Sequence, residues 1–210
     1  MLRRALLPAL AICGPLLLGA CGGAPPPRLE GPAISYRHLT QIRLNVASID
    51  FEEREPNPGP SDIGRTLQPT AAQAVMIMGR DRLASFGTEN KARFSVTRAQ
   101  ILRTRNQGSG GTFASDPGER LEVQLSARLD IQDPNGRRLG FAEASAQRTQ
   151  STDSNPRDRN VVAESLLRQA MFDLNTEFEY QIRRALRPYI VEGIAAEPAG
   201  SVSREELPRS

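Results

Sequence analysis

Residues 119–139 read ERLEVQLSARLDIQDPNGRRL, and this stretch decides the fold. From Leu121 to Ile131 every second residue is apolar, and the residues between them are polar or charged. An alternation of period two predicts a half-buried antiparallel strand with one face on the core and one face in water. The DPNG sequence at 133–136 then predicts a tight turn, because proline presets one dihedral angle and Asn-Gly accepts positive φ. We therefore expect a β-hairpin.

Three further strands are predicted around this one. The return strand, Leu139 to Gln150, carries Phe141 on one face and the small residues Ala142, Ala144 and Ala146 on the other, which favours either close packing or an edge position. Upstream, apolar residues alternate over 42–51 and again over 94–103. Both runs change phase part-way, the first near residues 47–48, where a bulge is one explanation.

Two helices are predicted from their end signals. Thr70 and Gln73 fit a capping box, and apolar residues recur at helical spacing as far as Phe86, before Gly87. Gly79 inside this helix either permits a close approach to the sheet or simply weakens the helix by about 1 kcal/mol. The second helix begins at Asn155-Pro156, continues for more than six turns, and ends or kinks at Pro188.

These elements predict an α+β fold in the order β-α-β-β-β-α. We expect a four-stranded, mostly antiparallel sheet with two helices packed on one face, in a single domain over 35–191. Residues 52–69 and 106–118 are expected to be loops, the second of them rich in glycine and serine without the spacing of a phosphate-binding loop. The 192–210 tail lacks apolar periodicity and is predicted to be disordered.

The N-terminus predicts export and lipidation. Arg3 and Arg4 precede a short apolar run, and Leu18-Gly19-Ala20-Cys21 resembles the lipobox of bacterial lipoproteins. That resemblance implies a signal peptide over 1–20, cleavage before Cys21, and covalent lipid on the Cys21 thiol. The following residues, 21–34, contain three consecutive prolines and predict a semi-rigid tether. The alternative is an ordinary signal peptide that happens to end near a cysteine.

Composition and motifs argue against several classes of function. Once Arg3 and Arg4 are removed with the signal peptide, 25 basic and 24 acidic side chains remain, which disfavours a nucleic-acid partner. No cysteine is left for a disulfide, a metal or a nucleophile, and His38 is the only histidine. The acidic residues Glu52, Glu53 and Glu55 alternate with Arg54 and are interpreted as a solvated turn. We predict no cofactor, no metal and no catalysis.

Lipobox, element order and hairpin pattern together resemble the small periplasm-facing outer-membrane lipoproteins. Two groups of this kind that it resembles are the lipoprotein partner of the lipopolysaccharide translocon and the auxiliary lipoproteins of ABC-type lipid transport. The resemblance covers roughly Leu44 to Tyr189, and the long tether and the 52–69 loop depart from the translocon partner. It implies an accessory role, and Gly22 after the cysteine resembles lipoproteins that are sorted to the outer membrane.

Two functions are expected from this combination. The first is a non-catalytic accessory or assembly subunit of an outer-membrane or trans-envelope transport machine, anchored by lipid and facing the periplasm. Its candidate partner face consists of Gln124, Ser126, Arg128 and Asp130 on the wet side of the central strand. The alternative is a lipid-binding or small-ligand-binding lipoprotein. Its cavity between sheet and helices would be lined by Met76, Met78, Phe86, Leu125, Phe141, Met171 and Phe178.

Overall fold

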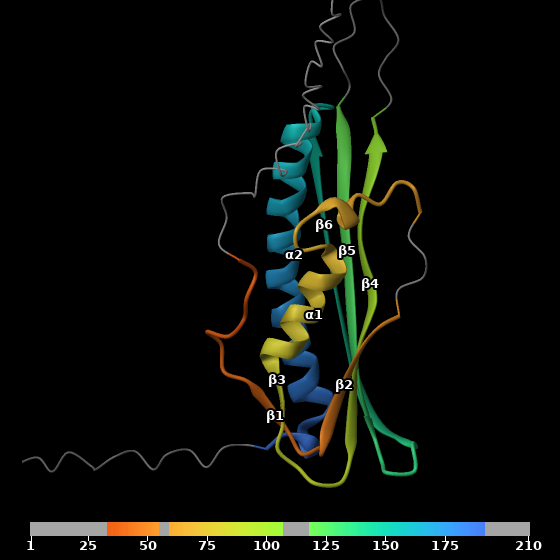
Figure 1. Ribbon diagram of the computed structural model, residues 1–210, viewed down its shortest axis with the longest axis vertical. Helices are drawn as coiled ribbons and strands as arrows, with labels where there is room; N and C mark the ends of the chain where they lie inside the picture. Colours follow the sequence, from red (N-terminus) through yellow and green to blue (C-terminus); the bar gives the residue numbers. More distant parts are fainter. Residues whose placement is uncertain (1–32, 55–58, 107–117, 192–210) are drawn as a thin grey trace, which may run out of the picture.

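The computed structural model describes residues 33–54, 59–106 and 118–191 (Figure 1). The predicted signal peptide, the predicted lipidation site Cys21, most of the predicted tether and the C-terminal tail lie outside these residues. The strands are β1 (Ile42–Leu44), β2 (Ser48–Glu53), β3 (Leu83–Ser85), β4 (Lys91–Arg105), β5 (Glu119–Gln132) and β6 (Arg138–Thr152). The helices are α1 (Ala71–Arg82) and α2 (Pro156–Ala185), with short 3₁₀ turns η1 (Gly64–Thr66) and η2 (Arg187–Tyr189).

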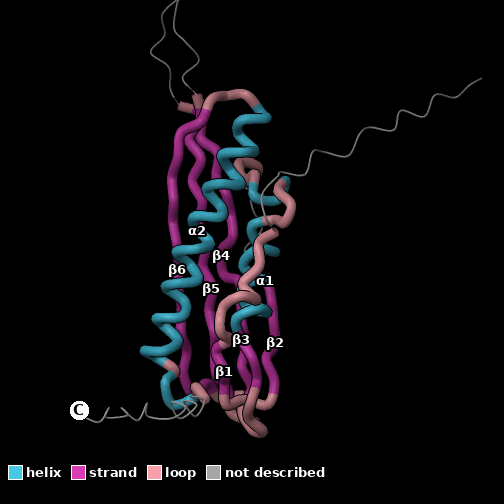
Figure 2. Tube along the Cα trace, turned by 90° about the vertical axis from the view of Figure 1, so that its left-hand side faces the viewer, coloured by secondary structure: helices cyan, strands magenta, loops and turns pink. Residues whose placement is uncertain are grey.

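The predicted α+β fold is confirmed. The main sheet has four strands in the order β2-β4-β5-β6, in which β2 runs parallel to β4 and the other pairs are antiparallel. Both helices lie on one face of this sheet, α1 against β4 and α2 against β5 and β6 (Figures 1 and 2). The opposite face, which we call the outer face, carries neither helix.

The strand predicted over 42–51 is in fact two strands in two sheets. β1 pairs in parallel with β3 in a separate two-stranded sheet, whereas β2 joins the main sheet beside β4. The phase shift near residues 47–48 therefore marks a change of sheet rather than a bulge. A backbone bond from the amide of Ala47 to the carbonyl of Asn90, at 2.7 Å, holds the chain at this crossing.

The second phase change does mark a bulge. The register of β4 against β5 shifts between Val96 and Arg98, so that Thr97 has no partner residue opposite it. The extra residue restores the apolar side chains that follow, Ala99 and Ile101, to the core side.

β5 is the central element of the core. Leu121, Val123, Leu125, Ala127, Leu129 and Ile131 are all buried, as their alternation predicts. The hairpin turn is confirmed as well, because Gly136 has φ +83° and the Asp133 carboxylate accepts from the amides of Asn135 and Arg137 at 2.9 and 2.8 Å. β6 is one of the two edge strands, and its Ala142 and Ala144 are buried beneath α2.

α1 has the predicted start but ends earlier than predicted. The Thr70–Gln73 capping box is present in both directions, at 3.1 and 3.2 Å. The sequence predicts helix through Phe86, whereas α1 ends at Arg82. The backbone after it becomes extended because β1 offers it partners: the amide of Phe86 donates to the carbonyl of Leu44 at 2.8 Å.

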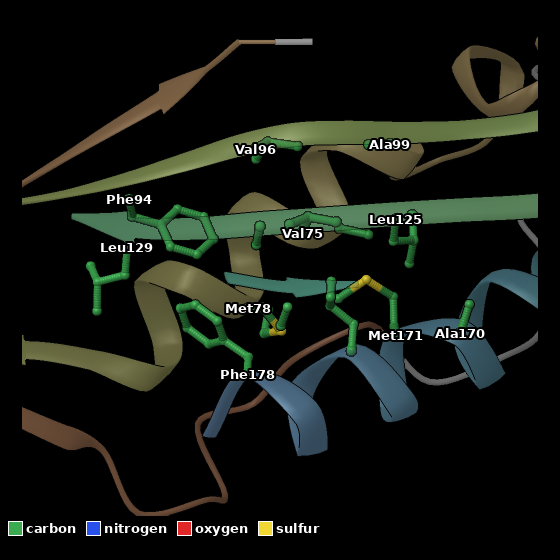
Figure 3. Packing of buried hydrophobic residues seen from close by; sticks show 14 of the residues in the cluster. Val75, Met78, Phe94, Val96, Ala99, Leu125, Leu129, Ala170, Met171 and Phe178 are labelled. Carbon is green, nitrogen blue, oxygen red and sulfur yellow. The ribbon is translucent and has the colours of Figure 1, made fainter. Parts of the chain in front are cut away.

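The helices and the sheet meet in a closely packed core (Figure 3). Phe94 of β4 and Phe178 of α2 pack edge to face, with ring centroids 5.5 Å apart. α2 starts as predicted, with the Asn155 side chain accepting from the amide of Arg157 at 3.0 Å. The helix ends at Ala185, and Pro188 lies in η2 beyond it.

Candidate functional site

The structure gathers the four predicted face residues on the outer face of β5. Cross-strand pairs extend the face in rows over β4, β5 and β6. These rows are Arg93–Asp130–Phe141, Ser95–Arg128–Glu143, Arg98–Ser126–Ser145 and Gln100–Gln124–Gln147. Of the residues contributed by β4 and β6, only Phe141 was singled out from the sequence, and it was assigned to a cavity rather than to this face. The β6 residues of the rows could have been predicted from the hairpin turn, because the turn fixes which residues of β6 lie opposite those of β5. One irregularity near Gln132 is the exception.

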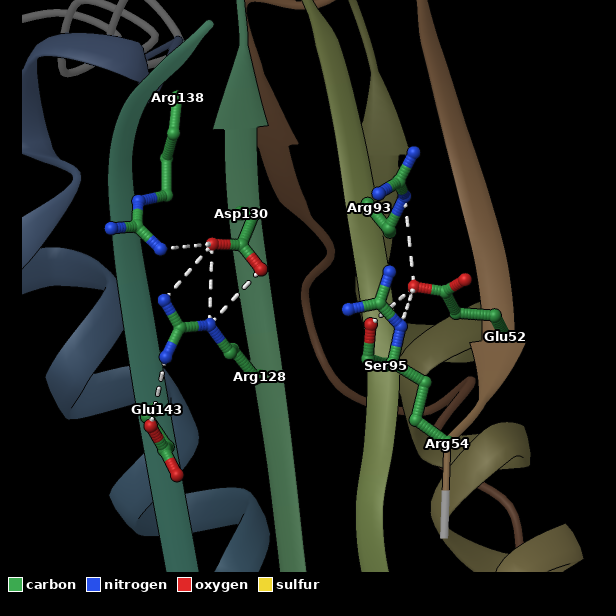
Figure 4. Close-up of polar contacts among 8 residues, drawn as sticks. All are labelled: Glu52, Arg54, Arg93, Ser95, Arg128, Asp130, Arg138 and Glu143. Atoms are coloured by element: carbon green, nitrogen blue, oxygen red, sulfur yellow. Dashed lines mark hydrogen bonds and ion pairs between the residues drawn. The ribbon is translucent and has the colours of Figure 1, made fainter. Parts of the chain in front are cut away.

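Arg128 is the centre of a charged cluster in one half of the outer face (Figure 4). Its guanidinium donates to both oxygens of Asp130 at 3.0–3.2 Å and to Glu143 at 3.2 Å. Arg138 approaches Asp130 at 3.9 Å from the neighbouring strand. The hydrogen bond to Asp130 raises the pKa of Arg128 above its ordinary value.

The alternation predicts that this face is exposed to solvent, but the face is partly buried around Asp130. Asp130 is only 7% exposed, because the two arginine side chains lie over it. Arg128 also lies 4.0 Å from the centroid of the Phe141 ring, and Arg138 lies 5.3 Å from it. These contacts order the Arg128 side chain in particular, so this half of the face presents a charged surface around a buried carboxylate.

A second cluster connects β4 to the edge strand β2 (Figure 4). Ser95 is only 1% exposed, and its hydroxyl donates to the Glu52 carboxylate at 2.8 Å. Arg54 and Arg93 approach the same carboxylate at 2.6 and 3.6 Å. The sequence places Glu52 and Glu53 in a solvated turn, but both belong to β2, which extends two residues further because β4 pairs with it throughout. Glu55 lies outside the described residues.

The other half of the outer face is built from glutamine amides together with Arg98 and Glu122. Gln100 and Arg98 both donate to the Gln124 side-chain oxygen, at 2.9 and 3.1 Å. Gln147 donates to Glu122 at 2.8 Å, and Gln124 donates to the same carboxylate. Hydrogen-bonding side chains are thus held in a fixed array across three strands, which suits recognition of a polar protein surface.

β6 adds an open sheet edge beside this array. Within the described residues β6 pairs with β5 and with no other strand. From Gly140 to Thr152 it contains no proline or lysine, the residues that commonly protect an edge strand. Its outward side chains, Ser145 and Gln147 among them, are exposed.

The structure does not form the cavity predicted between sheet and helices. Phe86 is 57% exposed and Phe141 is 45% exposed, so neither side chain faces the interior. The reason is that Phe86 lies beyond the end of α1 and Phe141 points to the outer face. Met78, Leu125, Met171 and Phe178 are buried in direct packing instead.

Two cavities occur elsewhere in the described chain. One, of about 310 Å³, is lined by residues including Glu53, Arg65 and Thr70. The other, of about 260 Å³, lies between residues 33–39 and α2, with His38 among its lining residues. Both are partly open to solvent. No described helix has the length and apolar character needed to cross a membrane.

Comparisons with known proteins give structural neighbours only. No family model matches the chain, and no curated protein matches it. A minor lipoprotein from Acinetobacter baumannii is 17% identical, with a TM-score of 0.34 over 71% of this chain and 99% of its own. A proposed lipoprotein from Caulobacter crescentus is 14% identical, with a TM-score of 0.32 over 63% and 85%. A neuraminyllactose-binding hemagglutinin homologue from Helicobacter pylori is 7% identical, with a TM-score of 0.34 over 69% and 88%.

Two of these three neighbours are described as lipoproteins, and none is named as a lipopolysaccharide-translocon or ABC-transport component. Those finer resemblances remain predictions. At such low scores the role of this chain has to be argued from its own residues.

Proposed function

We propose that this chain is a lipid-anchored envelope lipoprotein whose outer face docks a protein partner. In this role it is a non-catalytic accessory or assembly subunit of an outer-membrane or trans-envelope transport machine. The lipobox-like sequence ending at Cys21 supports the anchor, and Gly22 supports sorting to the outer membrane.

One observation carries the docking role: a four-stranded sheet keeps one whole face free of helices and covers it with ordered polar side chains. A sheet face that contacts only water does not need side-chain hydrogen bonds between neighbouring strands. Here Arg128, Gln124 and Glu52 each join side chains of neighbouring strands into fixed arrays. Side chains already held in place lose little entropy when a partner binds them.

The test is crosslinking in intact membranes followed by recovery of partners. Arg128 is a poor position to vary, because removing it would leave the buried Asp130 carboxylate without its closest cation. Ser145 is exposed on the outer face, and its side chain makes no hydrogen bond within the described residues. Ser165 is also exposed, lies on α2 on the other side of the sheet and supplies the control, although it accepts a hydrogen bond from Gln169 at 3.4 Å.

We expect Ser145→Arg to abolish recovery of a defined partner and Ser165→Arg to leave it unchanged. Circular dichroism should show both variants folded. Recovery that is lost equally in both, or retained in Ser145→Arg, would show that the outer face does not carry the contact. Recovery of nothing but monomer from the wild-type chain would contradict the accessory role itself.

A further inference from the structure

The chain enters the described structure on the helix side, where side chains hold it in place. The amide of Tyr36 donates to the Asp81 carboxylate at 2.8 Å, and the Arg37 guanidinium reaches the same group at 3.3 Å. The next residue along α1, Arg82, is 2% exposed; it donates to Asn175 of α2 at 3.0 Å and also to the carbonyl of Thr40. Residues 35–40 are thereby fixed against both helices, as Figure 2 shows.

The length of chain before this point limits how far the anchor can lie from the helices. Ala33 follows Cys21 by 12 residues. Even a fully extended chain of that length spans at most about 40 Å. We call the side of the molecule formed by α1, α2, β1 and β3 the helix layer. A lipid on Cys21 would therefore hold the membrane surface within reach of the helix layer.

Exposed apolar side chains gather on the helix layer. Of the five large hydrophobic residues that are most exposed in the described chain, Val161, Phe172 and Tyr180 belong to α2, and Phe86 follows β3. Phe172 is 70% exposed. The fifth, Phe141, lies on the outer face, where Arg128 stacks on it. Single exposed hydrophobics are ordinary, but here four of five lie on the side from which the tether leaves.

Charged side chains of both signs flank these residues, with Asp173 beside Phe172 and Glu179 beside Tyr180, and several arginines lie among them. The Arg43 guanidinium lies 4.8 Å from the centroid of the Phe86 ring. Arg184 and Arg187, at the end of α2, are exposed and make no ion pair within the described residues. Aromatic rings with neighbouring arginines suit the boundary between lipid headgroups and acyl chains. Val161 and Tyr180 lie about 28 Å apart along α2, so contact at both would lay the long axis along the membrane.

We infer that the helix layer rests on the surface of a phospholipid bilayer, with Phe172, Tyr180 and Phe86 reaching the headgroup region. This inference depends on the lipid anchor of the proposed function. It leaves the outer face pointing away from the membrane, where a protein partner can reach it.

Tryptophan reporters test this orientation cleanly, because the natural chain contains no tryptophan. The probe is the full-length lipidated chain in vesicles of phosphatidylethanolamine and phosphatidylglycerol, with or without bromine on the acyl chains. Phe172→Trp and Tyr180→Trp report on the helix layer, and Phe141→Trp is the matched control on the outer face. All three positions are at least 45% exposed, so the variants should fold.

We expect brominated lipid to quench Phe172→Trp and Tyr180→Trp while the fluorescence of Phe141→Trp stays unchanged. Equal quenching of Phe172→Trp and Phe141→Trp, or no quenching of any variant on vesicles that carry the protein, would overturn the orientation and leave the anchor standing. Failure of the protein to stay with the vesicles would overturn the anchor, and the orientation with it.

Discussion

At the scale of single residues, Gly79 lowers the intrinsic stability of α1 but allows this helix to pack closely on the sheet. An added Cβ at this position would lie 2.6 Å from the Phe94 ring, closer than such atoms approach in real proteins. Phe94 in turn packs on Phe51 and Phe178, at centroid distances of 5.8 and 5.5 Å. The glycine lets α1 approach β4 closely enough for this aromatic cluster to form. Of the two explanations open from the sequence, close approach is correct.

This contact makes a prediction about stability. Alanine is favoured over glycine in a helix by about 1 kcal/mol, whereas overpacking a core costs about 1–3 kcal/mol. We expect the clash to dominate, so that Gly79→Ala lowers the free energy of unfolding by about 1 kcal/mol, measured by urea denaturation. Gly59→Ala is the control, because nothing lies within 4 Å of its added Cβ. A Gly79→Ala chain as stable as the wild type would show that Phe94 moves aside freely.

Side-chain contacts differ in how well they can be predicted from the sequence. The Thr70 cap and the Asn155 cap depend on neighbours three and two residues away, and both were predictable. Arg128 and Glu52 each also have a partner on another strand, Glu143 and Ser95, which lie 15 and 43 residues away. Sequence alternation places such residues on a face but does not say which of them meet.

At the scale of elements, β5 was predictable because its environment is regular along its whole length. It is flanked by β4 and β6 and covered on one face only, so one simple period describes it. The 42–51 segment was less predictable, since its two halves pair with different strands. Likewise α1 gives way to β3 only because β1 lies beside it. Such long-range pairing overrides the local helical pattern.

The difference between the two faces of β5 can be measured. We expect Leu125→Ala to lower the free energy of unfolding by about 2–5 kcal/mol, because it removes a buried side chain and leaves a cavity. Gln124→Ala, the adjacent residue on the outer face, should cost about 1 kcal/mol, the value of a typical hydrogen-bond loss. The half-buried position of Gln124 and its bonds to Gln100 and Arg98 make the loss larger than for a freely solvated side chain. Equal losses in urea denaturation would mean that both faces of the sheet are covered.

At the scale of the whole molecule, the arrangement places the surfaces of the two proposed roles on opposite sides of the sheet. The helix layer receives the chain from its N-terminal side, and the outer face lies across the sheet from it (Figure 2). A sheet with helices on both faces could not offer this separation. The sequence predicted the single helix layer from the alternation of β5, whereas the attachment of residues 35–40 to Asp81 and Arg82 carried no local signal.

Both proposed roles depend on Cys21, which makes its removal the most informative change to the whole molecule. Cys21→Ser removes the thiol that would accept the lipid but leaves the described domain untouched. We expect wild-type cells to incorporate radiolabelled palmitate into the chain, and Cys21→Ser to abolish the label and yield either soluble protein or unprocessed precursor. Because the chain contains only one other cysteine, Cys13 within the predicted signal peptide, the label has a single acceptor in the mature chain. Absence of label from the wild-type chain would contradict the anchor. The outer face would then have to find its partner as a protein free of the membrane.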